Sequence, residues 1–156
     1  MDLSRFDSFD LTPTHGIVWP LPLASLSRVG QSVLADRDGK GRPHYGIDLF
    51  APAGTVILCA AAGRVVRVVD GRTSTDPHRR RAGLWVDIFV MGLLFRYLHL
   101  TSVIVTENQT IQTGRVIGFL GSAPDHLHFE IRRHDAIEGK YGDAIDPLRL
   151  LPKRST

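Results

Sequence analysis

The stretch PDHLHFEI (residues 124–131) places two histidines one residue apart within a run that favours β structure. Successive side chains point to opposite faces of a strand. His126, His128 and Glu130 are therefore predicted to share one face, and three apolar residues share the other. Burial of the apolar face would send both imidazoles to a common surface, where a metal ion or a reacting group could lie between them.

Five other short runs are rich in Val, Ile, Leu and Phe, and each is predicted to be a strand. Turn residues separate them, since the chain has 15 glycines and 9 prolines, and no long stretch has a helical period with caps. The pattern predicts a mainly β fold with little helix, an antiparallel β sandwich or a partly open barrel of short strands. The five runs are residues 55–60, 64–70, 84–90, 94–100 and 115–121.

Composition excludes several classes of protein. The 156 residues are 43% apolar and 22% charged, as in an ordinary globular domain. The net charge is only +3, and no basic stripe with interleaved aromatic residues suggests a nucleic-acid partner. The basic cluster 78–81 is interpreted as part of an exposed loop, residues 71–83, that joins two strands. The most apolar window, residues 84–95, contains Asp87 and is too short to span a bilayer, so no membrane insertion is expected.

A second segment, GRPHYGIDLF (residues 41–50), repeats the pattern of polar residues on one face. In an extended chain His44, Gly46 and Asp48 share a face, and Gly46 would leave open space between the imidazole and the carboxylate. Tyr45 and Ile47 would turn the other way, into the core. His44 and Asp48 are therefore predicted to bind the same ligand.

His99 adds a further imidazole at the end of the run LFRYLHL, where alternation predicts that Phe95, Tyr97 and His99 share a face. A single strand histidine is commonly structural, but the conjunction of three histidine-bearing segments favours a site. Two imidazoles and a carboxylate suit catalytic zinc, and a remaining imidazole can move protons. Spacing alone leaves open which histidines bind metal. Neither a His-Glu-x-x-His motif nor a Gly-x-Ser-x-Gly elbow is present.

The joint set of motifs resembles the lysostaphin-type zinc metalloendopeptidases, which cut peptide crosslinks of bacterial peptidoglycan. The resemblance runs from about Trp19 to Leu151 and includes VWPLPLAS, HYGIDLF, RYLHL, TGRVIGFLG, HLHFEIR and DPLRLL. It implies a domain at residues 17–151, preceded by an irregular arm at 1–16 and followed by a polar tail at 152–156.

The roles that the resemblance implies concern five side chains. His44, Asp48 and His128 would bind one Zn²⁺ per chain, while His99 and His126 would be the catalytic pair. A zinc-bound water would attack the peptide carbonyl with the assistance of these two histidines. Glu130 could orient a ligand imidazole by accepting its N–H, or it could be a plain exposed carboxylate.

Three departures from the family pattern bear on substrate and location. The loop GSAPDHLH before His126 is short, no tyrosine precedes Tyr45, and no secretory signal is visible at the N-terminus. The resemblance still implies action at the cell wall, in the periplasm or as a secreted enzyme. Residues 1–43 could cover the groove, with His15 as an extra ligand in a latent form.

Alternatives remain within the same fold. A non-catalytic cell-wall-binding or amidase-regulating module would typically have a broken ligand set, whereas all five positions are present here. A zinc carboxypeptidase would differ only in its products. A lipoyl-type carrier is excluded because it needs a lysine at a hairpin tip, and Lys40, Lys140 and Lys153 lie elsewhere. A monomer with a peptidoglycan peptide as substrate is expected, and the bond cut is open between glycyl–glycine bridges, D-alanyl–diaminopimelyl crosslinks and peptides outside the wall.

Overall fold

The computed structural model describes residues 16–31, 33, 39–40, 43–122, 124–133 and 143–154. Almost all of the expected N-terminal arm, together with His15 and His134, lies outside the described residues. Within them, no helix is both long enough and apolar enough to cross a membrane.

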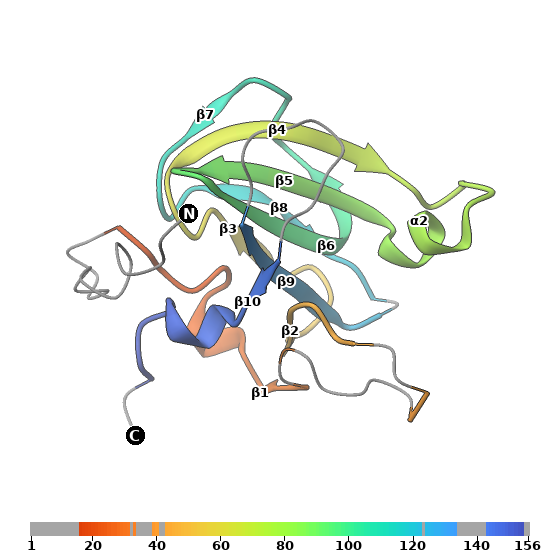
Figure 1. Ribbon diagram of the computed structural model, residues 1–156, viewed down its shortest axis with the longest axis horizontal. Helices are drawn as coiled ribbons and strands as arrows, with labels where there is room; N and C mark the ends of the chain where they lie inside the picture. The colour runs from red at the N-terminus through yellow and green to blue at the C-terminus, as the bar shows by residue number, and fades with distance from the viewer. Residues whose placement is uncertain are drawn as a thin grey trace.

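The described strands form one antiparallel sheet that does not close on itself, which confirms the prediction of a mainly β fold with little helix (Figure 1). Its main path runs β1-β2-β9-β6-β5-β4-β7, with β10 beside β9, and with β8 joining β6 to β3. The strands are β1 (Arg28–Val29), β2 (Ile47–Phe50), β3 (Val56–Leu58), β4 (Gly63–Asp70), β5 (Leu84–Val90), β6 (Leu93–Val103), β7 (Thr110–Ile111), β8 (Val116–Leu120), β9 (His126–Arg133) and β10 (Ala144–Ile145).

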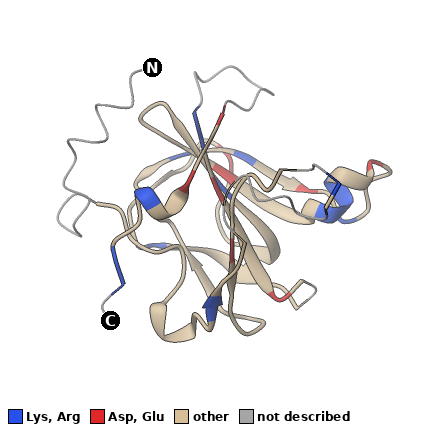
Figure 2. Ribbon diagram, turned by 60° about the horizontal axis from the view of Figure 1, so that its bottom comes forward, with Lys and Arg blue, Asp and Glu red and all other residues tan. Residues whose placement is uncertain are grey.

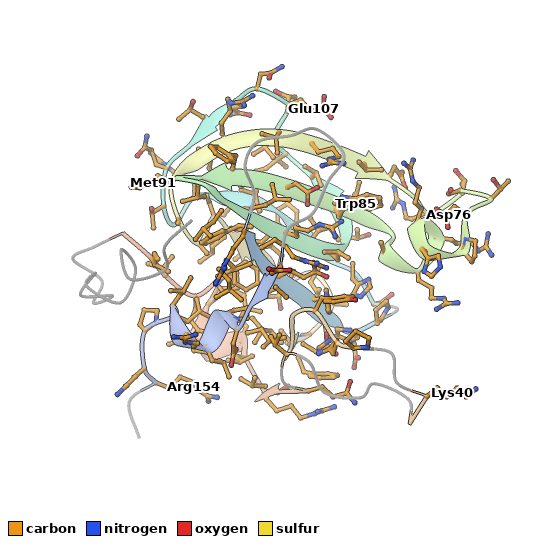
Figure 3. The ribbon with its side chains drawn as sticks, viewed as in Figure 1. Lys40, Asp76, Trp85, Met91, Glu107 and Arg154 are labelled. Carbon is orange, nitrogen blue, oxygen red and sulfur yellow. The ribbon has the colours of Figure 1, made fainter. Side chains whose placement is uncertain are left out.

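One face of the β2, β9 and β6 segment forms the core because its alternate residues are apolar. Register pairs Ile47 with Phe129, and Phe129 with Tyr97. These three side chains are fully buried, and the rings of Phe129 and Tyr97 lie 5.2 Å apart. The sticks in Figure 3 fill the interior between the long strands and the segments around β2. The opposite face of β9 is thereby left for polar side chains.

Strand β6 changes partner along its length. Residues 93–98 pair with β9, whereas Leu100, Ser102 and Val103 pair with β8. Between these two halves the register against β5 shifts, because two steps along β5 from Leu84 to Val86 match three steps along β6 from Leu100 to Tyr97. A β-bulge of this kind bends a strand and redirects a side chain. His99 lies in the bulge.

Residues 71–83 do not form a plain loop, because they contain the short helix α2 (Pro77–Ala82). Asp76 caps its first turn by accepting a hydrogen bond from the backbone N–H of His78 at 2.9 Å, and Pro77 occupies the first turn. Gly83 ends the helix with a φ of 73°. Asp-Pro before the basic cluster and Gly after it were the local signals for this helix. The predicted exposure of the cluster is confirmed, since residues 78–81 are all exposed.

The segment that follows β10 packs against the body of the domain. After the 3-10 helix η3 (Pro147–Arg149), Leu150 and Leu151 are buried in the core. The indole N–H of Trp19 donates a hydrogen bond to the Pro152 carbonyl at 3.0 Å. A second 3-10 helix, η2 (Leu23–Ser25), follows Trp19. These contacts tie the two ends of the described domain together.

Candidate functional site

A buried polar cluster lies where the lead-in to β2 meets β9. Register places Asp48 opposite His128, so both side chains stand on the face away from the core. His44 reaches the same point from the segment just before β2. All three residues are buried. The predicted convergence of these three side chains is thus observed, because two-residue periodicity on paired strands puts Asp48 and His128 on one face.

The three donor atoms of this cluster lie at distances that suit a metal ion. His44 Nε2 is 3.2 Å from Asp48 Oδ1 and 3.2 Å from His128 Nδ1, and His128 Nδ1 is 2.8 Å from Asp48 Oδ1. Zinc bonds of about 2.0–2.1 Å at tetrahedral angles would separate neighbouring ligand atoms by roughly 3.3 Å. Two imidazole nitrogens and one carboxylate oxygen at this spacing are compatible with zinc.

The charges in the cluster also favour a cation at its centre. His128 Nε2 lies 2.8 Å from Glu130 Oε1, so a neutral His128 with its proton on that nitrogen would turn the Nδ1 lone pair toward Asp48. A bare lone pair 2.8 Å from a carboxylate oxygen is repulsive unless a proton or a metal lies between them. Burial alone would lower the pKa of His128, but hydrogen bonds to Asp48 and Glu130 raise it. Burial would likewise raise the pKa of Asp48, yet hydrogen bonds with His128 and His44 hold it well below its ordinary value.

Gly46 is needed for close approach between chains, and the expectation of open space beside it is wrong. A Cβ at this position would clash with the Phe129 carbonyl oxygen and would lie 2.8 Å from Glu130 Cγ and 3.0 Å from His128 Nε2. The space is filled by β9 itself. Any side chain here would push apart the hydrogen bond that orients His128.

His99 reaches the cluster only because of the β-bulge. Strict alternation would put it on the core face with Tyr97, so the prediction that these residues share a face is wrong. At a φ of 73°, its backbone is left-handed, and the imidazole turns to the polar face instead. Its ring centroid lies 5.1 Å from that of His126 and 6.1 Å from that of His128. Burial, with the nearby charges of His128 and His126, lowers the pKa of His99 to about 3.

His126 begins β9 and completes the group. Its Nε2 lies 3.5 Å from Asp48 Oδ1, and its ring lies 5.0 Å from the ring of Phe50, its register partner. Its side chain is 14% exposed, compared with 5% for His128. His126 and His99 therefore face each other on the more open side of the cluster.

A ladder of charges, buried except for the half-buried Arg67 at its end, continues from Glu130 across three further strands. Cross-strand register pairs Glu130 with Arg96, Arg96 with Asp87, and Asp87 with Arg67. Arg96 Nη1 lies 3.4 Å from Glu130 Oε2, and Arg96 Nε lies 2.9 Å from Asp87 Oδ1. Arg67 Nε lies 3.3 Å from Asp87 Oδ2 and ends the ladder. Sequence reasoning missed it, although a single charge inside each apolar run of 84–90 and 94–100 was the available signal.

Tyr45, His78 and Cys59 lie outside this group. Tyr45 does not enter the core. It is 42% exposed, and its ring lies 4.4 Å from the guanidinium carbon of Arg132. His78 is exposed on α2. Cys59 is fully buried, and burial raises the pKa of its thiol to about 11.

The chain is similar in sequence to several known proteins. The lipoprotein YgeR of Escherichia coli is 33% identical to this chain, over 71% of this chain and 40% of its own length. Murein hydrolase activator NlpD of Escherichia coli is 31% identical over 70% of this chain and 26% of its own length. The chain thus spans well under half of these relatives.

The solved catalytic domain of lysostaphin from Staphylococcus simulans shares the fold, with a TM-score of 0.63 at 23% identity over 78% of this chain and 89% of that domain. Residues 42–147, which contain the whole polar cluster, match the profile of Peptidase family M23. The chain belongs to peptidase family M23.

Proposed function

We propose that this protein is a zinc-dependent endopeptidase that hydrolyses peptide crosslinks of bacterial peptidoglycan. The observation that carries the proposal is the converging donor set of His44, Asp48 and His128, with two further imidazoles beside it. The three residues would hold one Zn²⁺. When bound there, zinc would supply a Lewis acid and would lower the pKa of a coordinated water.

The chain's own residues would do the rest of the chemistry. Burial lowers the pKa of His99, so its imidazole is neutral at neutral pH and suited to holding a hydrogen bond, and the same lowering makes it a weak proton acceptor. His126 faces it across 5.1 Å between ring centroids. One imidazole would take the proton of the attacking water, and the other would hold or protonate the oxygen or nitrogen that gains charge.

Glu130 would position a ligand. By accepting the Nε2–H of His128, it keeps the Nδ1 lone pair of that residue turned to the centre of the cluster. Arg96 and Arg132 in turn hold Glu130, at 3.4 Å and 2.8 Å from its Oε2. The ligand orientation thus rests on a buried network.

The domain limits and setting belong to the same proposal. We assign residues 17–151 to the peptidase domain and 152–156 to a polar tail, and we expect a monomer that acts at the cell wall or in the periplasm. The relatives include proteins named as lipoproteins and murein hydrolase activators, which supports a peptidoglycan setting.

The test is mass spectrometry of fragments released from purified sacculi of both crosslink types, with zinc-loaded and chelator-treated protein. We expect chelator-sensitive release of peptides. His99→Ala and His126→Ala should abolish release yet retain zinc, measured by atomic absorption, while the exposed His78→Ala should behave as the wild type. Near-native activity of either site variant would show that the assigned roles are wrong.

A second candidate is a non-catalytic regulator of cell-wall amidases, favoured by the similarity to NlpD, a murein hydrolase activator. It predicts no release by the fully zinc-loaded protein alone, but faster release when a purified amidase is added. The complete set of five side chains supports the peptidase instead.

A further inference from the structure

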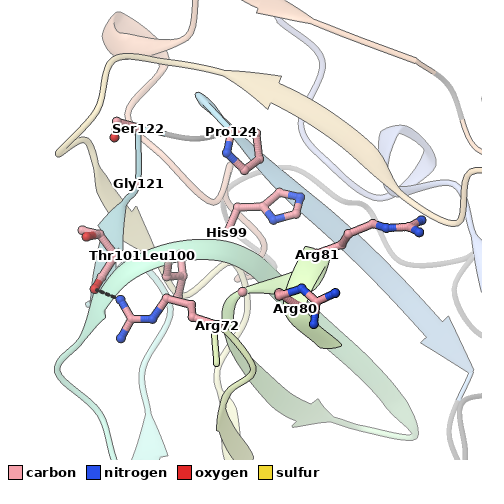
Figure 4. Close-up of a pocket in the computed structure, with 10 residues that line it drawn as sticks. Arg72, Arg80, Arg81, His99, Leu100, Thr101, Gly121, Ser122 and Pro124 are labelled. Atoms are coloured by element: carbon pink, nitrogen blue, oxygen red, sulfur yellow. Dashed lines mark hydrogen bonds between the residues drawn. The ribbon is translucent and has the colours of Figure 1, made fainter. Parts of the chain in front are cut away.

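A pocket of about 220 Å³ opens next to His99, between α2, strand β6 and the turn that follows β8 (Figure 4). Three arginines line it: Arg72, Arg80 and Arg81. The described lining includes no aspartate or glutamate. Figure 2 shows the blue arginines of α2 gathered at this end of the molecule. The pocket is thus a basic recess that has His99, one member of the candidate catalytic pair, in its wall.

Two of these arginines already have partners. Arg72 forms an exposed ion pair with Asp70, with Nη2 to Oδ2 at 2.7 Å, and donates a hydrogen bond to the Thr101 carbonyl at 3.2 Å. Arg80 donates a hydrogen bond to the Ser74 carbonyl at 2.8 Å. These contacts hold the two guanidinium groups at the rim of the pocket.

Arg81 differs, because its guanidinium has no hydrogen bond or ion pair with any residue that the structure describes. Figure 4 shows Arg81 and Arg80 on the same side of the pocket as His99. A guanidinium presents a planar fork of donors that matches a carboxylate. The pocket therefore offers an unused carboxylate-binding group close to where a peptide would be cut.

We propose that this pocket is a subsite for a free carboxylate of the peptide substrate, with Arg81 as its principal contact. The inference rests on the proposed peptidase function and narrows its substrate. A glycyl–glycine bridge has no carboxylate beside the bond that is cut. A D-alanyl–diaminopimelyl crosslink does, and the pocket selects this carboxylate-bearing class.

The test compares two synthetic crosslinked peptides that differ only at the diaminopimelyl carboxylate, one free and one amidated. The wild type should cleave the free acid with a KM about tenfold lower than its KM for the amidated peptide. A difference of this size is expected for one charge-assisted hydrogen bond. Arg81→Gln should raise the KM of the free acid by about tenfold, leaving kcat and the amidated peptide nearly unchanged. Arg81→Glu should reverse the preference.

Arg79→Gln is the matched control, since Arg79 lies on the same short helix but does not line the pocket. It should keep the wild-type preference. Equal cleavage of both peptides by the wild type, or an equal loss in the Arg79 and Arg81 variants, would overturn the subsite.

A peptide-binding measurement tests the subsite independently of the proposed peptidase activity. The free and amidated peptides are titrated by calorimetry into zinc-loaded His126→Ala protein, with and without Arg81→Gln. If the free acid binds more tightly and Arg81→Gln removes this difference, the subsite is supported. This holds even if the wild type cleaves neither peptide, because absence of cleavage would overturn only the proposed peptidase activity. Identical binding of both peptides overturns the subsite, whether or not they are cleaved.

Discussion

The buried cluster between β2 and β9 and the arginine pocket beside α2 lie on either side of His99 but are built differently. In the cluster, donor atoms contact one another across paired strands and little solvent reaches them. In the pocket, the arginines stand on an exposed turn and a short helix, and Arg81 has no partner among the described residues. Paired strands hold the proposed catalytic groups, whereas a surface connection would carry the proposed recognition.

The two regions also differ in what supports them. The ladder from Glu130 through Arg96 to Asp87 is buried, so each charge depends on its neighbour for solvation. The Arg72–Asp70 pair beside the pocket is about half exposed on each side chain, and water solvates both groups. Removal of a charge should therefore cost stability in the first region and specificity in the second.

The largest effect on stability is expected for Asp87→Ala. It leaves the buried Arg96 without its 2.9 Å partner, so the free energy of unfolding should fall by about 3–5 kcal/mol. Urea unfolding of the metal-free protein measures this loss. Asp70→Ala, which removes an exposed carboxylate that also pairs with an arginine, should unfold as the wild type does. Equal behaviour of the two variants would show that the ladder is not a buried network.

A smaller effect is expected for Glu130→Gln, which keeps the shape of the side chain but removes its charge. Because Glu130 accepts the Nε2–H of His128, zinc should bind about 10–100-fold more weakly. Competition with a chromophoric chelator measures the affinity. Glu107→Gln, which alters an exposed acceptor for the Val68 N–H, is the control. Unchanged affinity in the Glu130 variant would mean that His128 is oriented by other contacts.

The mildest effect is a pH dependence to which Glu130 contributes. Burial would raise the pKa of Glu130, but the hydrogen bond with His128 and the charge of Arg96 outweigh it, so the folded pKa lies well below the ordinary 4.5. The unfolded chain then binds more protons as the pH falls through about 4.5, and this stability is progressively lost below that value. Urea unfolding of the metal-free protein between pH 6 and pH 3 should show the decline.

Two variants show whether Glu130 causes this pH dependence of urea unfolding. Glu130→Gln removes the titrating carboxylate, so its stability should fall less steeply with acid. Arg81→Gln, in the exposed pocket, should follow the wild-type pH curve. A wild-type slope in the Glu130 variant would place the acid sensitivity elsewhere.

Local patterns in the sequence were enough to predict much of the fold and of the cluster. The runs 84–90 and 126–133 are strands with the predicted bounds, because apolar alternation is a local property that burial enforces. Spacings of two and four residues put His128, Glu130, His44 and Asp48 on the expected face for the same reason. The roles of these residues remain proposals that the metal and activity measurements test.

Only the tertiary structure decided the rest. His99 turns to the cluster because strand β6 must match β5, β8 and β9 at once, and the mismatch is absorbed as a bulge. Arg80 and Arg81 line a pocket because α2 folds back beside β6, some 20 residues away in sequence. The charge ladder depends on register between four strands. Short-range periodicity determines which face a side chain takes within one strand, but register between distant strands determines which side chains meet.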